Sequence, residues 1–224
     1  MPPVVRRLAG PVEVEPVWRN AFGGLTFRFG DRFVKWNPPD SPVDLERERL
    51  RLEWISARHP APSPLEWGVD GGGQWLLTAA VGGQQAVGDR WRSRRREAIG
   101  AMATGLRAIH SLAVEDLPPE WTRDSWVAFE PPSLGPRPPV GQRVVVHGDA
   151  CAPNTLISEA GEWTGNVDFG DLSVGDRWAD LAVASLSVDW NFGPGHQHEF
   201  YEAYGVEPDP VRIAYYRALW NLES

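Results

Sequence analysis

Three oxygen-bearing side chains follow one short apolar run in the second half of the sequence. Asp149 comes soon after the apolar run 144–146, Asn154 stands five residues after Asp149, and Asp168 another fourteen residues on. The run is typical of a buried strand, and the residues after it predict a hairpin that returns Asp168 to the same edge. Hard oxygen ligands suit Mg²⁺, which completes its shell with water and substrate phosphates. We therefore expect Asn154 and Asp168 to bind metal and Asp149 to orient or deprotonate a hydroxyl.

This arrangement is the one that phosphoryl transfer requires. A metal neutralises the developing charge, and a carboxylate aligns the attacking hydroxyl with the γ-phosphate. The catalytic loop of protein kinases also has an Asp five residues before an Asn, followed later by a DFG motif. The DFG motif here is Asp168-Phe169-Gly170. Because Asp149 already provides the base, His147 is predicted to be a hydrogen-bonding residue of the loop and not a proton carrier.

The residues around Asp149 resemble one family. Residues 147–154 read His-Gly-Asp-Ala-Cys-Ala-Pro-Asn, and this run resembles the aminoglycoside phosphotransferase family, particularly its 3'-type enzymes. The segment 175–182 is similar to a downstream segment of the same family. The resemblance implies a protein-kinase-like fold, transfer of phosphate from ATP to an antibiotic hydroxyl, and a bracing role for Asp180 beside the catalytic loop. ATP and GTP are both open as the phosphate donor.

The only lysine of the chain also has a kinase-like setting. Of the 22 lysines and arginines, Lys35 alone is a lysine, and it ends a predicted strand as the strand-3 lysine of kinases does. A helix predicted over residues 43–58 places Glu48 on its apolar face, whereas Glu46 points to the side. A carboxylate on an apolar face needs a partner. We therefore expect Lys35 and Glu48 to pair and to bind the nucleotide phosphates, with the loop at residues 20–24 covering them.

The order of the predicted elements indicates an α+β, two-lobed protein-kinase-like fold. Residues 1–81 form a small antiparallel-sheet lobe with one helix, which would bind the nucleotide. Residues 82–224 form a larger, mainly helical lobe for catalysis and acceptor binding. The expected strands are 12–18, 25–29, 32–36, 64–68, 74–81, 143–147, 155–158 and 162–168, and the expected helices are 43–58, 89–112, 177–190, 197–204 and 208–222. The first helix is expected to begin at an N-cap formed by Ser41.

The amino-acid composition limits the kinds of binding partner that can be expected. The 224 residues carry a net charge of −8, with a pI near 5.2. This argues against nucleic acid, which needs clustered basic charge, and favours a cationic small molecule. No apolar run reaches membrane-spanning length, so no membrane contact is expected. The single cysteine, Cys151, fits a reducing cytoplasm and is expected to be a small buried or half-buried residue and not a nucleophile. Monomer and dimer are both open.

The part of the chain that would bind the acceptor departs from the 3'-type pattern. The segment 110–147 is shorter than in typical relatives, Asp171 replaces their arginine, and Asn221 replaces an acidic ligand for the amines of the drug. The shortened segment stays acidic through Glu115, Asp116, Glu120, Asp124 and Glu130. We expect a cationic acceptor, whose identity and phosphorylated hydroxyl do not follow from these residues.

The sequence therefore predicts an ATP-dependent, Mg²⁺-assisted phosphotransferase that modifies a hydroxyl of an aminoglycoside or similar cationic antibiotic and gives resistance. One alternative is a metabolic kinase of the same fold that acts on an amino alcohol or a sugar. Another is a nucleotide-binding or antibiotic-binding protein without catalysis. The intact set of Asp149, Asn154 and Asp168 argues against a binding protein, because binding alone has no need of a base.

Overall fold

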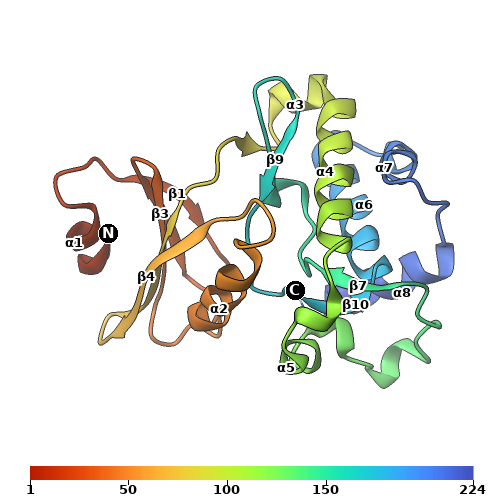
Figure 1. Cartoon of the computed structure of the whole chain (residues 1–224), viewed down its shortest axis with the longest axis horizontal. Coiled ribbons are helices and arrows are strands. Elements are labelled where there is room, and N and C mark those ends of the chain that lie inside the picture. The colour runs from red at the N-terminus through yellow and green to blue at the C-terminus, as the bar shows by residue number, and fades with distance from the viewer. Residues whose placement is uncertain (224) are drawn as a thin grey trace. The chain divides into compact units, whose positions relative to one another are not determined.

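Five antiparallel strands form the sheet of the N-terminal part of the chain. A computed structural model describes residues 1–223 and divides into two compact units, Met1–Val81 and a second that begins at Gly82. The sheet of the first unit has the order β1-β2-β3-β5-β4, and its strands β1, β3 and β4 are labelled in Figure 1. Its strands are β1 (Glu15–Arg19), β2 (Leu25–Phe29), β3 (Arg32–Asn37), β4 (Ser63–Asp70) and β5 (Gly73–Ala79).

Two helices accompany this sheet in the first unit, α1 (Pro3–Ala9) and α2 (Leu45–Ile55). The sequence does not reveal α1, because seven residues are too few to show helical periodicity. Its buried Val4 and Val5 pack in one cluster with Phe27 and Trp75 of the sheet. Burial of this apolar surface, and not local propensity, explains why so short a helix forms.

The expected N-cap of α2 was wrong. Asp44 caps the helix, since its Oδ1 accepts hydrogen bonds from the backbone N–H groups of Glu46 (2.8 Å) and Arg47 (3.2 Å). Ser41 Oγ instead accepts from Val43 N at 3.2 Å and closes a turn before the helix. An aspartate cap also places a negative charge at the positive end of the helix dipole, which a serine does not.

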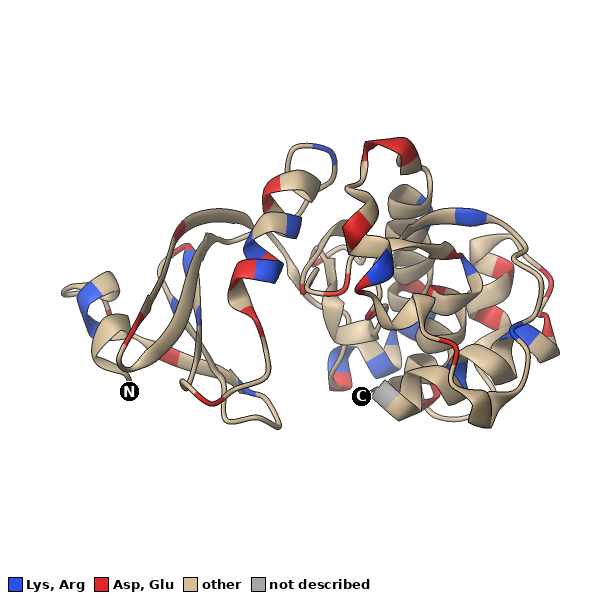
Figure 2. Ribbon diagram, turned by 90° about the horizontal axis from the view of Figure 1, so that it is seen from below, with Lys and Arg blue, Asp and Glu red and all other residues tan. Residues whose placement is uncertain are grey.

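Helices dominate the second unit (Figure 1), and acidic and basic segments are interspersed along both units (Figure 2). The described helices are α3 (Asp89–Ser93), α4 (Arg95–His110), α5 (Pro119–Arg123), α6 (Trp178–Phe192), α7 (Gln197–Tyr204) and α8 (Pro210–Glu223), with four short 3₁₀ turns. Two small sheets have the orders β10-β7 and β6-β8-β9. Their strands are β6 (Gln84–Gln85), β7 (Arg143–Val146), β8 (Thr155–Ile157), β9 (Trp163–Asn166) and β10 (Ser173–Asp176). Among the described residues, no helix is long and apolar enough to span a membrane.

The long helix expected over residues 89–112 is broken into α3 and α4 at Arg94, whose backbone leaves the helical region (φ −115°, ψ 35°). The guanidinium of Arg94 donates to the carbonyl oxygens of Glu159 (2.9 Å) and Ala160 (2.8 Å) in the β8–β9 turn. These contacts lie 65 and 66 residues away along the chain, so helical periodicity alone does not reveal the break.

Strand β10, which the sequence did not predict, pairs antiparallel with β7 and brings Ser173 opposite Val146. Its four residues, Ser, Val, Gly and Asp, do not have the composition that is typical of a strand, although the strand is buried. Gly175 is required there, because a Cβ at this position would overlap Val127 Cγ1. The pairing fixes β7, and β7 leads directly into the loop that carries Asp149.

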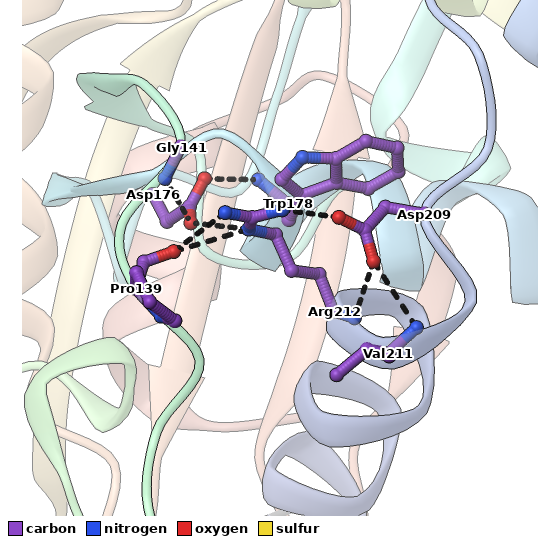
Figure 3. Close-up of polar contacts among 7 residues, drawn as sticks. All are labelled: Pro139, Gly141, Asp176, Trp178, Asp209, Val211 and Arg212. Carbon is purple, nitrogen blue, oxygen red and sulfur yellow. Dashed lines mark hydrogen bonds and ion pairs between the residues drawn. The ribbon is translucent and has the colours of Figure 1, made fainter.

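An arginine-centred cluster ties the proline-rich segment to this sheet (Figure 3). The guanidinium of Arg212, at the start of α8, donates to Pro139 O at 2.7 and 3.1 Å and pairs with the buried Asp176 at 3.6 Å. Asp176 also accepts from Gly141 N at 2.9 Å. Because Asp176 ends β10, this cluster anchors the far end of the β7–β10 pair.

Candidate active site

The catalytic loop of the second unit is held by the buried carboxylate of Asp180 on α6. Asp180 Oδ2 accepts from the backbone N–H of His147 at 2.7 Å, and Oδ1 accepts from Gly148 N at 2.9 Å. The side chain is fully buried, so water cannot replace the hydrogen bonds between this carboxylate and the two amides. The contacts match the bracing role that the family resemblance implied for Asp180.

A second pair of residues, which the sequence did not reveal, completes this network. His110 Nε2 lies 2.9 Å from Asp180 Oδ2, and His110 Nδ1 lies 2.7 Å from the hydroxyl of Tyr204. Burial by itself raises the pKa of the Asp180 carboxyl. The hydrogen bond and charge of His110 and the amide of Gly148 lower it more, so the pKa of Asp180 lies below its ordinary value. Asp180 is therefore ionised in the folded protein.

His147 is a structural residue of the loop, as predicted. Its Nδ1 accepts from the backbone N–H of Asp149 at 3.2 Å, so its Nε2 carries the proton and donates to Val167 O at 3.0 Å. The ring packs on Phe169 with the ring centres 4.6 Å apart. Since both ring nitrogens are committed, His147 joins the loop of Asp149 to the residues that precede Asp168.

Glycine in place of the kinase arginine at position 148 has a steric cause. Gly148 has φ +88°, and a Cβ there would overlap the carbonyl oxygen of Asp171. The carbonyl oxygen of Gly148 accepts from Trp126 Nε1 at 2.8 Å. The residue after the DFG motif and a tryptophan of the shortened segment thus both contact the catalytic loop.

The structure brings together the three residues that the sequence predicted for this part of the site. Asn154 Nδ2 donates to both the backbone oxygen and Oδ2 of Asp149, each at 2.9 Å. Asp149 is half-buried and Asp168 is exposed. Asp168 has φ +67°, in the left-handed region that non-glycine residues seldom adopt. Because the amide nitrogen of Asn154 is engaged by Asp149, the amide oxygen is the atom that Asn154 can offer to a ligand.

The electrostatics of this cluster fit a cation. Burial raises the pKa of the Asp149 carboxyl, and the neighbouring charge of Asp168 raises it further. Two carboxylates that repel each other and one amide oxygen form a hard donor set of the kind that Mg²⁺ accepts. In the described chain, no group of three or more His, Cys, Asp or Glu side chains could hold a metal by itself. The residues present therefore suit an ion that takes its other ligands from water and phosphate.

Cys151 is half-buried beside this cluster. Burial raises the pKa of its thiol far above the ordinary value, and the charge of Asp149 acts in the same direction. The thiol stays protonated, in agreement with the expectation that Cys151 is not a nucleophile. The next residue, Ala152, donates its N–H to Ser187 Oγ of α6 at 2.9 Å, so α6 holds the loop at a second point.

In the first unit, Lys35 and Glu48 form the predicted ion pair. Lys35 Nζ on β3 lies 2.7 Å from Glu48 Oε1 on α2, and their side chains are 30% and 7% exposed. Glu48 lies on the buried face of α2 with Leu45 and Leu52. The carboxylate is thus shielded while the ammonium keeps partial access to solvent, which is what binding a further anion requires.

The loop at residues 20–24 is ordered by its own first residue. Asn20 Oδ1 accepts from the N–H groups of Phe22 (3.0 Å) and Gly24 (2.7 Å). A Cβ at Gly24 would overlap Asn37 Oδ1, so any larger residue there would have to displace the buried Asn37 side chain. Two glycines in a hairpin gave only a weak signal of this loop, and the role of Asn20 was not predicted.

A small antiparallel sheet with a lysine–glutamate pair, and a mainly helical unit with an Asp, Asn and DFG loop, define the class of protein-kinase-like phosphotransferases. A family model described as the phosphotransferase enzyme family matches residues 18–135 and 131–217. The chain belongs to this family, and it is a phosphotransferase. The resemblance stated from the loop sequence, and the fold class, are confirmed.

Individual relatives support the same family assignment. The chain is 35% identical to an aminoglycoside 3'-phosphotransferase of Streptomyces fradiae, with 81% of each chain covered. It is 32% identical to streptomycin 3''-kinase of Streptomyces griseus, over 87% of this chain and 86% of that one. Among solved structures, aminoglycoside phosphotransferase APH(3'')-Id of Streptomyces rimosus is similar, with a TM-score of 0.74, 29% identity and coverage of 96% and 94%.

Replacing Asp180 by Asn tests the network at the base of the loop. The amide has one acceptor oxygen where the carboxylate has two, so its NH₂ group must face a backbone N–H. We expect the free energy of unfolding to fall by about 3 kcal/mol and turnover to fall with it. Chemical denaturation measures the first effect and ADP release the second.

The pH dependence of Asp180→Asn has a definite sign. The pKa of Asp180 is lower in the folded than in the unfolded state, so its charge stabilises the fold above the unfolded value of about 3.9 and this contribution is lost as pH falls. The stability difference between wild type and variant should therefore be largest near pH 7 and shrink below about pH 4. Asp89→Asn, whose side chain is 97% exposed, is the control. A loss as small as that of the control would contradict the bracing role.

Proposed function

We propose that the chain is an ATP-dependent aminoglycoside phosphotransferase, which transfers the γ-phosphate to a hydroxyl of a cationic antibiotic and so gives resistance. The observation that carries the proposal is the Asp149–Asn154–Asp168 cluster on a loop braced by Asp180. Relatives above 30% identity are named as aminoglycoside 3'-phosphotransferase and streptomycin 3''-kinase. The similar structure from Streptomyces rimosus has also been solved with ADP and streptomycin.

Each residue of the cluster has a proposed role. Asp149 orients the acceptor hydroxyl and accepts its proton, and its raised pKa makes it a better base than an ordinary carboxylate. Asn154 holds Asp149 in place through its nitrogen and, with Asp168, would hold Mg²⁺, which supplies charge neutralisation at the transferred phosphoryl group. The positive φ of Asp168 and the packing of Phe169 on His147 set the direction of that second carboxylate.

Lys35 and Glu48 are proposed to bind the nucleotide. The Lys35 ammonium would contact the phosphates of ATP, while Glu48 keeps it charged and directed. The backbone of the Asn20 loop would lie over the phosphates. The net charge of −8 then favours the approach of a cationic acceptor, whereas the arriving ATP requires the local positive charge that Lys35 provides.

Mass spectrometry tests the function directly. The chain is incubated with ATP, Mg²⁺ and a pool of aminoglycosides, with amino alcohols and sugars in a parallel pool. A product heavier by one phosphate in the aminoglycoside pool supports the proposal, and growth protection of a sensitive host extends it to resistance. Product only in the second pool would favour a metabolic kinase, and tight ATP binding without ADP release in either pool would favour a binding protein.

Asp149→Ala tests the base. We expect turnover to fall by at least about a hundredfold, because general base catalysis contributes factors of about 10² to 10⁴, while ATP still binds. Turnover is followed by ADP release, and ATP affinity by calorimetry. Asp89→Ala, in the same unit but 97% exposed, is expected to behave as wild type. Near-normal turnover of Asp149→Ala would show that the role is wrongly assigned.

Lys35→Arg tests the nucleotide site. A planar guanidinium is larger than the ammonium and directs its N–H groups in a fixed fork, so at position 35 it would contact Glu48 and a phosphate in a different geometry. We expect kcat/KM for ATP to fall about tenfold or more, which corresponds to about 1.4 kcal/mol. The control is Arg7→Lys, which exchanges the same two residue types in an exposed pair with Glu66. An ATP kcat/KM within twofold of wild type would mean that the single lysine has no special role.

A further inference from the structure

The peptide unit that joins Gly148 to Asp149 is held at both of its polar ends. Its N–H group donates to Nδ1 of His147 at 3.2 Å, and its C=O group accepts from Nε1 of Trp126 at 2.8 Å. The hydrogen bonds of Asp180 go to the two amides before this unit. The last peptide unit before the proposed base is therefore held by a tryptophan of the segment 110–147.

Glycine at position 148 makes this peptide unit easy to rotate. Without a Cβ, the backbone angles of glycine are restricted far less than those of other residues, and Gly148 already has φ +88°. The peptide unit is planar, so its rotation changes the φ angle of Asp149 and turns the side chain. The hydrogen bond to His147 is at the long end of the usual range. The shorter bond from Trp126 is thus the stronger restraint on this rotation.

Trp126 is itself anchored to the sheet that carries the loop. It begins a 3₁₀ turn, in which Ser125 Oγ accepts from Val127 N at 3.3 Å. Ser125 Oγ also accepts from Ser173 Oγ of β10 at 2.9 Å. The buried Val127 fits against Gly175 of the same strand. Because β10 pairs with β7, the indole and the catalytic loop are fixed to the same two strands.

We infer that Trp126 is a positioning residue of the reaction, which directs the Asp149 carboxylate by holding Gly148 O. The inference rests on the proposed function, in which Asp149 is the base. A base must lie within hydrogen-bond reach of the hydroxyl whose proton it accepts. Rotation of the peptide unit before Asp149 therefore slows the transfer step and leaves the binding of ATP unchanged.

Trp126→Phe removes the indole N–H and keeps an aromatic ring. We expect the single-turnover rate of phosphate transfer to an aminoglycoside that the wild-type protein phosphorylates to fall about tenfold or more, since misplacing a reacting group is costly. The half-saturating concentrations of ATP and acceptor should stay within twofold, because no group proposed to bind either is changed. The matched control is Trp91→Phe, whose rate should stay within twofold. Trp91 Nε1 is buried and has no hydrogen-bond partner among the described residues.

The same substitution in the Asp149→Ala background shows whether Trp126 acts through the base. A residue that acts through a second group loses its effect when that group is removed. We expect Trp126→Phe to change the residual rate of Asp149→Ala by less than twofold. A tenfold loss in both backgrounds, or an unchanged rate in Trp126→Phe alone, would overturn the inference and leave the proposed function standing.

Hydrogen exchange tests the contact without turnover. Amide exchange of the full chain without ATP is recorded by NMR for the wild type, for Trp126→Phe and for a protein with 3-benzothienylalanine at position 126, in which sulfur replaces the indole N–H and both rings remain. We expect the Asp149 amide to exchange about fivefold faster in both variants, as the loss of one hydrogen bond implies.

The amides of Val145 and Val146 in the buried strand β7 report on the fold and should exchange as in the wild type. This measurement applies even if the wild-type protein phosphorylates no aminoglycoside, so it separates the inference from the proposed function. Exchange of the Asp149 amide at the wild-type rate in the benzothienylalanine protein would show that Trp126 does not restrain the peptide unit, and the inference would be wrong.

Discussion

The geometry of the candidate active site depends on one buried carboxylate. Asp180 lies on a helix that is buried along most of its length, and its two oxygens accept from the consecutive amides of His147 and Gly148. Burying this charge is costly unless every lone pair is used, and His110 supplies the remaining donor. Because two adjacent amides are fixed, the direction of the next residue, Asp149, is fixed as well.

The two carboxylate environments of the second unit have opposite character. Around Asp180 donors outnumber acceptors, so its pKa falls in spite of full burial. Around Asp149 burial and the charge of Asp168 act together, so its pKa rises. The first arrangement is stable by itself, whereas the second leaves repulsion that a bound cation relieves. Two carboxylates with opposite pKa shifts, one on α6 and one in the loop that it holds, are typical of a catalytic site, where structural and reacting groups need different protonation behaviour.

The sequence predicted those parts of the molecule that depend on short spacing. Asp149, Asn154 and Asp168 are linked by one loop and one hairpin, and Lys35 and Glu48 by the single connection between β3 and α2, so their proximity follows from segments that are close in sequence. His110 and Tyr204 were missed because their contacts with the network span 70 and 94 residues. Strand β10 and helix α1 were missed because each is too short to show a period and forms only when packed on a distant partner.

The degree of constraint differs between the two ends of the proposed reaction. At the phosphate end, the only lysine of the chain lies 2.7 Å from the shielded Glu48, and a compact ammonium is not interchangeable with a planar guanidinium where one group must contact both a carboxylate and a further anion. At the acceptor end, only a negative environment is required, and a carboxylate, a helix end or an indole face can each supply it.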